Sequence, residues 1–164
     1  MYLYRVKQFY WSITAHVNAK DIEYLRKYLN EEEINIFNKL AVLDQKHSIN
    51  VAMDIENSCE TKDINKNILI KAALLHDIGK SEYRSNVLNK TVMVLLDKIT
   101  GSKIKKYKSI KMINIYYNHA ELGYNILKDQ GYDEMLLYLV KNHHNTEIKG
   151  NLYLDILRKS DNNN

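Results

Sequence analysis

Residues 68–80 read ILIKAALLHDIGK, and this stretch decides the fold of the chain. Its first eleven residues include only three polar ones, Lys71, His76 and Asp77, and Gly79 follows as a residue typical of helix ends. A helix that is apolar almost all round belongs in the middle of a helical bundle. A buried imidazole beside a buried carboxylate is costly unless both bind something charged, so the stretch predicts a metal-binding centre.

The composition narrows the class of protein. The chain has 164 residues, enough for one domain with a sizeable core, and it contains no proline. Runs that alternate apolar and polar residues are missing, so we predict an all-α fold. The single cysteine, Cys59, excludes an internal disulfide and a zinc site built from several cysteines.

Charge and hydropathy set the expected location and partners. A net charge of +4 is mild for a nucleic-acid-binding protein, so we do not expect nucleic acid as a partner. No signal peptide is visible, and no apolar run approaches the roughly 20 residues that a membrane span needs. We expect a cytoplasmic protein with no membrane partner, and the sequence does not indicate an oligomeric state.

Apolar residues at helical spacing predict further helices around the central one, which we expect to run from Ile68 to Ile78. Asp21 and Asp44 are expected to cap two of them, and His119 to open another. Gly123 inside a helix costs about 1 kcal/mol relative to alanine, so we expect a close approach to a neighbouring helix there. The other predicted helices cover residues 2–17, 21–29, 31–43, 44–59, 87–100, 119–131, 132–144 and 152–161.

Six histidine and aspartate residues lie on the inward stripe of a predicted helix or at its end. Four imidazoles and two carboxylates without a thiolate suit iron, manganese, zinc or nickel, and they are enough for two such metals per chain. Asp77 has two oxygens and can bridge both metals, which would then clamp a phosphoryl group. The six candidate metal ligands are His47, His76, Asp77, His119, His143 and Asp161.

The order of these residues resembles that of the HD-domain superfamily of metal-dependent phosphohydrolases. The strings KHSINVA, LLHDIGK and HAELG around His47, the His76-Asp77 pair and His119 carry the resemblance, with His143-His144 and Asp161 after them. It implies an all-helical bundle with the metals between the central helices. It also implies an HD domain over residues 44–164, on which helices of residues 1–43 pack.

The resemblance also implies roles for individual residues. The first histidine, the His-Asp pair and the final aspartate would hold one metal, and the two downstream histidines with the shared Asp77 would hold the second. Members with a single metal lack counterparts of His119 and His143, which favours two metals here. Lys80 would contact the substrate phosphate and, with Asp77, serve catalysis, while His144 would also bind substrate.

The expected function is hydrolysis of a nucleotide or another small phosphate ester or anhydride. Two alternatives stay open: a mixed-valent di-iron oxygenase, as is myo-inositol oxygenase of the same superfamily, and a non-catalytic nucleotide-binding regulatory domain. A lysine-rich stretch is interpreted either as a solvated surface or as a rim near the site that attracts phosphate. Its members are Lys103, Lys105, Lys106, Lys108 and Lys111.

Overall fold

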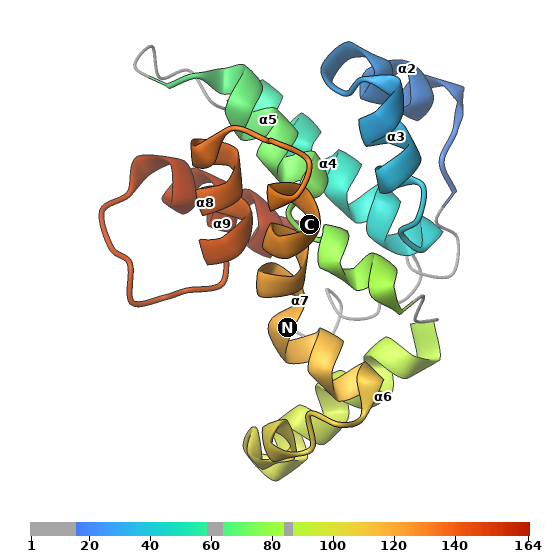
Figure 1. Cartoon of the computed structure of the whole chain (residues 1–164), viewed down its shortest axis with the longest axis vertical. Helices are drawn as coiled ribbons and strands as arrows, with labels where there is room; N and C mark the ends of the chain where they lie inside the picture. Colours follow the sequence, from blue (N-terminus) through green and yellow to red (C-terminus); the bar gives the residue numbers. More distant parts are fainter. Residues whose placement is uncertain (1–15, 59–63, 84–86) are drawn as a thin grey trace.

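The computed structural model describes residues 16–58, 64–83 and 87–164, without the side chains of residues 87–91. These residues form eight α-helices and two short 3-10 helices and no strand, so the all-α fold is confirmed (Figure 1). The predicted helix over residues 2–17 lies almost entirely outside the described residues. In the described part, no helix is both long enough and apolar enough to cross a membrane.

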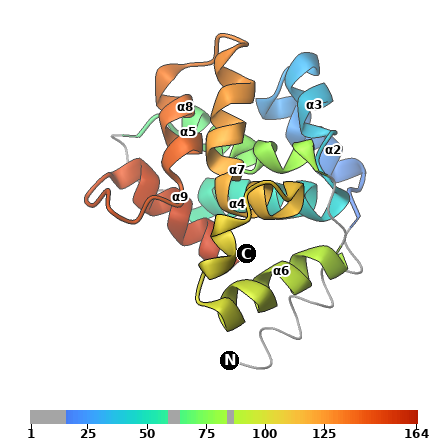
Figure 2. The same cartoon turned by 60° about the horizontal axis from the view of Figure 1, so that its bottom comes forward.

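The helices pack around α5, which lies at the centre of the bundle. Helix α5 contacts α2, α4, α8 and α9. Helix α7 packs against η1, the short 3-10 helix after α5, and against α8 (Figures 1 and 2). In chain order the elements are α2 (Ala19–Tyr28), α3 (Glu31–Phe37), α4 (Val42–Ser58), α5 (Lys66–Leu75), η1 (Ile78–Glu82), α6 (Val87–Thr100), η2 (Lys103–Lys106), α7 (Lys111–Lys128), α8 (Glu134–Asn142) and α9 (Leu152–Asn163).

Helix α5 is the apolar core element that the sequence predicts, but it ends three residues early. All its residues from Leu69 to Leu75 are buried except Lys71, whose Nζ reaches Glu33 Oε1 at 2.8 Å. The α-helix stops at Leu75 rather than at Ile78, with His76 as its C-cap, and the chain tightens into η1. The turn between the two helices therefore carries the His76-Asp77 pair.

Gly79 permits a close approach of two backbones. Gly79 lies inside η1 with no left-handed φ, so the predicted role as a helix terminator is wrong. A Cβ there would collide with the carbonyl of His119 and lie 2.6 Å from the Gly123 nitrogen. A Cβ on Gly123 would lie 3.2 Å from the Gly79 nitrogen, so the close approach predicted for Gly123 is confirmed. The two glycines hold η1 against the middle of α7.

The predicted caps of two helices are wrong, because each helix begins earlier than expected. Asn18 caps α2 by accepting from the Asp21 backbone nitrogen, and the Asp21 carboxylate accepts from the Asn18 backbone nitrogen in return. Asp21 also accepts from Lys46 Nζ at 2.8 Å, which ties α2 to α4. Helix α4 begins at Val42, so Asp44 lies in its first turn.

Three further boundaries differ from the sequence prediction. Helix α3 stops at Phe37 instead of continuing to residue 43. The Gln45 amide donates to the carbonyls of Asn38 and Leu40, so these backbone groups of the link between α3 and α4 have partners without a helix. Helix α7 begins at Lys111, so His119 lies in its middle rather than at its start. Helix α8 likewise ends at Asn142, with His143 as its C-cap.

Candidate metal centre

The six predicted metal ligands come from five parts of the bundle and meet at its centre. His47 lies on α4, the His76-Asp77 pair follows α5, and His119 lies in the middle of α7. His143 ends α8, and Asp161 lies in the last turn of α9, whose end reaches the middle of the bundle in Figure 1. Segments far apart in the sequence therefore supply one cluster.

The cluster divides into two groups whose ligand atoms each lie within 4.8 Å of one another. We call His47, His76 and Asp161 the first group, and His119, His143 and His144 with Asp77 the second group. In the first group, His47 Nε2 lies 2.9 Å from Asp161 Oδ1, and His76 Nε2 lies 3.6 Å from the same oxygen. In the second, His119 Nε2 lies 3.0 Å from His144 Nε2.

Asp77 stands between the groups and turns one oxygen to each. Its Oδ2 lies 3.5 Å from His76 Nε2 and 4.0 Å from His47 Nε2. Its Oδ1 lies 3.3 Å from His119 Nε2 and 4.0 Å from His143 Nε2. One carboxylate therefore faces both sets of imidazoles, as a bridging ligand would.

Backbone carbonyls orient the three buried imidazoles. Nδ1 of His76 lies 2.7 Å from the Ala73 carbonyl, and Nδ1 of His143 lies 2.7 Å from the Val140 carbonyl. Nδ1 of His119 contacts carbonyls of its own helix at 3.2 Å. A carbonyl only accepts, so each Nδ1 carries the hydrogen and Nε2 is left to face the cluster. Metal-binding histidines are commonly oriented in this way.

Unsatisfied buried atoms show that the cluster fits a cation. In the described part of the chain, five buried side-chain nitrogen or oxygen atoms have no hydrogen-bond partner. Three of them converge here: His76 Nε2, Asp77 Oδ1 and His143 Nε2. Buried polar atoms are rarely left without a partner, because each costs free energy. Divalent cations held by nitrogen and oxygen donors would satisfy all three atoms.

The electrostatics of the first group favour positive charge. Burial lowers the pKa of His76, but Asp77 and Asp161 overcome this and raise it to about 9. Burial likewise opposes ionisation of Asp161, yet the hydrogen bond with His47 and the nearby His76 imidazole hold its pKa below the ordinary value. Two carboxylates beside two imidazoles thus attract a cation to this group.

The second group keeps its imidazoles neutral. Burial and the neighbouring Lys80 lower the pKa of His119 to about 4. Burial, helped by the nearby histidines, also lowers the pKa of His143 well below its usual range. The pKa of His144 is lowered too, mainly by burial. Neutral imidazoles are the form that ligates a metal.

Lys80 places a positive charge beside Asp77. Its Nζ lies 2.5 Å from Asp77 Oδ2, and its side chain is 28% exposed. Burial opposes the charge of Lys80, but Asp77 raises the pKa of Lys80. Burial also opposes ionisation of Asp77, but Lys80 and the nearby histidines hold the pKa of Asp77 well below its ordinary value. The carboxylate is therefore paired through Oδ2 and unpaired only through Oδ1.

Arg158 is a residue of this region that the sequence analysis missed. It lies on α9, one turn before Asp161, and its side chain is 16% exposed. Nε donates to the His143 carbonyl at 3.0 Å, Nη2 donates to those of Asn142 and Asn145, and Nη1 donates to that of Ile148. The guanidinium fixes the end of α8, where the predicted ligand His143 and the predicted substrate contact His144 lie, to the helix that carries Asp161.

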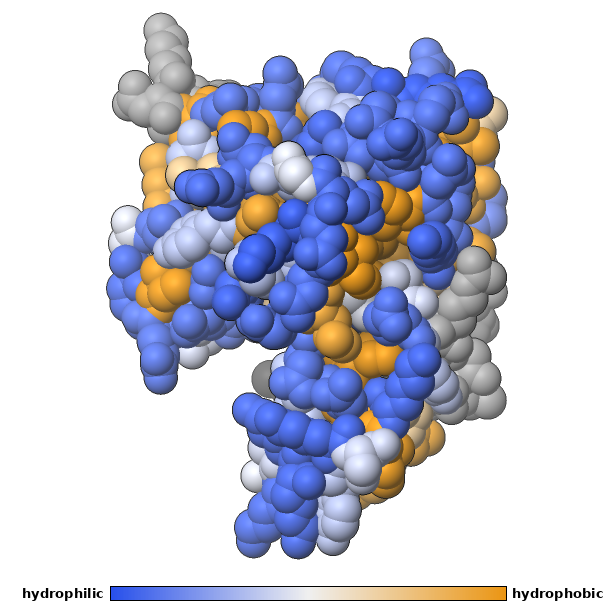
Figure 3. All heavy atoms as spheres, in the orientation of Figure 1, coloured by the Kyte–Doolittle hydropathy of each residue, from blue (hydrophilic) through white to orange (hydrophobic). Residues whose placement is uncertain are grey.

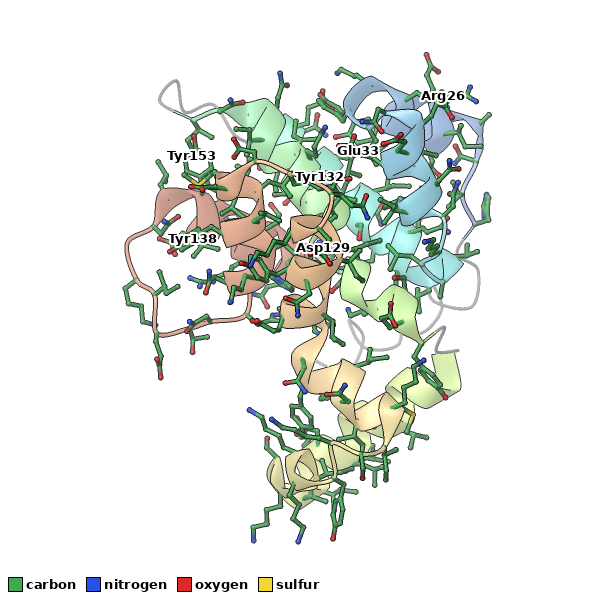
Figure 4. All side chains as sticks on the ribbon, viewed as in Figure 1. Arg26, Glu33, Asp129, Tyr132, Tyr138 and Tyr153 are labelled. Atoms are coloured by element: carbon green, nitrogen blue, oxygen red, sulfur yellow. The ribbon has the colours of Figure 1, made fainter. Side chains whose placement is uncertain are left out.

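A hollow of about 660 Å³ lies elsewhere, beside the start of α5. Glu33 of α3 and Tyr132 of the link before α8 line it and lie near each other in Figure 4. Its most buried charge is satisfied, because both Glu33 oxygens accept from Lys71 Nζ, at 2.8 and 3.0 Å. The unsatisfied atoms, rather than the hollow, mark the candidate site.

A family comparison agrees with this geometry. The model of the HD domain family matches residues 45–162, a span that includes all six predicted ligands. The chain belongs to the HD domain family. HD domains are in general metal-dependent phosphohydrolases that bind divalent metals and act on small phosphate substrates, and this one carries a cluster of histidines and aspartates that could hold metal. Comparisons with curated proteins and with solved structures found no match.

Proposed function

We propose that this HD domain hydrolyses a phosphoric ester or anhydride with two divalent metals that share Asp77. The substrate would be a nucleotide or another small phosphorylated compound. The observation that carries the proposal is the position of Asp77, whose two oxygens face different sets of imidazoles. The unsatisfied atoms on both sides of it support one cation on each side.

The first metal would be held by the first group with Asp77 Oδ2, and the second metal by the second group with Asp77 Oδ1. These nitrogen and oxygen donors suit iron, manganese, zinc or nickel. When bound, two such metals neutralise charge on a phosphoryl group and lower the pKa of a water molecule. The 3.0 Å separation of the His144 and His119 Nε2 atoms supports a ligand role for His144, besides the substrate contact expected from the sequence.

Lys80 would position the substrate phosphate. It follows Asp77 by three residues, and its partly exposed side chain carries a flexible ammonium group. If Asp77 serves as a metal ligand, the ammonium of Lys80 would face solvent and the substrate instead of Oδ2. There it would stabilise the negative charge of phosphate oxygens.

The test of function is a screen of metal-loaded protein. Protein purified without chelators and reconstituted anaerobically with manganese should release phosphate or a nucleotide from at least one member of a panel of nucleotides, dinucleotides and cyclic dinucleotides. A chelator should abolish the release. Turnover that requires oxygen, or no turnover across the panel by protein with both metals bound, would contradict the proposal.

A lysine substitution tests the role of Lys80 in the same assay. Lys80→Gln should raise KM or lower kcat by roughly 10-fold to 100-fold, because a charge beside the phosphate is lost. Lys27→Gln is the matched control, since Lys27 also pairs with a carboxylate, that of Glu56 at 2.6 Å, but far from the cluster. Equal kcat and KM values for the two variants would show that Lys80 does not contact the substrate.

A further inference from the structure

The positive charge of the chain is concentrated in one protruding element. We define the lysine-rich tip as residues 98–111, which join α6 to α7 through η2 and form the lower end of the molecule in Figure 1. The tip contains six lysines and no acidic residue. It therefore carries a net charge of +6, whereas the whole chain carries +4 and the remainder −2.

Among the residues that the structure describes, the lysines of the tip have no acidic partner. All six lysines are exposed. Within the described ranges, no carboxylate oxygen lies within 4.0 Å of the Nζ atom of any of them, the distance that defines an ion pair. Elsewhere Lys27, Lys46, Lys71, Lys80 and Lys141 each pair with a carboxylate. The nearest acidic residue in the sequence, Asp97, is engaged by the hydroxyls of Tyr116 and Tyr117.

Exposed apolar side chains lie among these lysines. Ile99 is 72% exposed, and Tyr107 and Ile110 are 52% and 50% exposed. Leu95, one turn before Ile99 on α6, is 56% exposed. Figure 3 shows hydrophobic residues along one side of the protrusion and hydrophilic residues on the other side and at its end. A surface that is both cationic and apolar is typical of segments that lie at a membrane interface.

We propose that the lysine-rich tip binds the surface of a membrane that contains anionic lipids. The lysines would contact lipid phosphates, and Ile99, Tyr107 and Ile110 would enter the boundary between head groups and acyl chains. Nucleic acid fits less well, because aliphatic side chains such as those of Ile99 and Ile110 gain nothing from a phosphate backbone. The proposed attachment is to the membrane surface and needs no helix that crosses the membrane.

The tip lies apart from the candidate metal centre. Lys111 precedes His119 on α7 by eight residues, which is about 12 Å of helix. Helix η2 packs back against α7, where Lys105 Nζ lies 5.8 Å from the centre of the Tyr117 ring rather than at the cluster. A surface charge as far from His119 as Lys111 is largely screened at physiological salt. The lysines are thus better suited to hold the protein at a charged surface than to act as a phosphate-attracting rim of the site.

Vesicle flotation with the full, metal-loaded chain tests the proposal. The protein should float with vesicles of phosphatidylcholine mixed with phosphatidylglycerol, not with phosphatidylcholine alone, and added salt should weaken the binding. Each lysine near an anionic surface is worth about fivefold in partitioning, so Lys103→Gln/Lys105→Gln/Lys106→Gln should reduce binding on the order of 100-fold. Ile99→Ser/Ile110→Ser should reduce the apolar contribution to vesicle binding, which is the binding that remains at high salt.

The matched control changes the same charge elsewhere. Lys128→Gln/Lys149→Gln/Lys159→Gln removes three exposed lysines outside the tip and should leave flotation nearly unchanged. Equal loss in both triple variants, or equal flotation with neutral vesicles, would overturn the proposal. So would tighter binding to single-stranded DNA than to anionic vesicles, or a dimer that Ile99→Ser/Ile110→Ser dissociates. Bound metal and thermal unfolding of each variant show that the chain is still folded.

Discussion

The two groups of the candidate metal centre shift the pKa values of their histidines in opposite directions. In the first group two carboxylates raise the pKa of His76 to about 9, whereas in the second group burial and Lys80 lower that of His119 to about 4. The second group has three imidazoles and only the shared Asp77 oxygen, while the first also has Asp161. The number of carboxylates, more than the number of imidazoles, decides how strongly each side attracts a cation.

The largest effect should follow from the residue that the groups share. Asp77→Asn keeps the shape of the side chain but loses the negative charge that faces both groups. We expect hydrolysis to fall by at least 100-fold, about the loss on removing one transition-state contact. The stabilisation by saturating metal, about 2.7 kcal/mol at 100 times Kd, should also disappear from thermal unfolding curves. A circular dichroism spectrum like that of the wild type would show that the fold survives.

The next effect should separate the groups. His47→Ala removes a ligand of the first group only, and His119→Ala one of the second group only. Each variant should keep a single metal, and the metal left in His119→Ala should bind more tightly, because it faces two carboxylates instead of one. Calorimetric titration with manganese measures both affinities. Loss of both metals from either variant would show that the groups act as one site.

A smaller effect should come from Arg158. Arg158→Gln removes the guanidinium that fixes the end of α8, so the second group should lose affinity by about 10-fold to 100-fold, as is usual for residues that orient ligands. The first metal should bind nearly as in the wild type. Arg26→Gln, on the exposed face of α2 (Figure 4), is the control for charge. An equal loss at both metals would instead indicate general destabilisation.

The sequence predicted the central helix and the ligand set because both depend on local patterns. An apolar run that ends in His76-Asp77 needs no knowledge of its neighbours, and helical spacing places the other candidates on inward faces. The prediction that these residues act as metal ligands remains to be tested, as does the division at residue 43. The hydrogen bonds of Lys80 to Asp77 and of Asp21 to Asn18 span only three residues, so local reasoning could have found them.

The errors came from contacts between distant segments. The end of α3 depends on the Gln45 amide, and the requirement for glycine at 79 depends on the approach of α7. Arg158 is one of four arginines in a chain with 20 lysines, but nothing near it in the sequence indicates that it binds carbonyls 10 to 16 residues earlier. Such contacts become visible only when the helices are packed.

The metal content at saturation tests the shared carboxylate most directly. Wild-type protein and Asp77→Asn would be dialysed side by side against manganese and analysed for bound metal per chain. Two metals in the wild type and none held tightly by Asp77→Asn are the expected result. Two metals retained by Asp77→Asn would contradict a centre in which Asp77 bridges two cations. So would a wild-type protein that binds one metal, if His119→Ala also binds one.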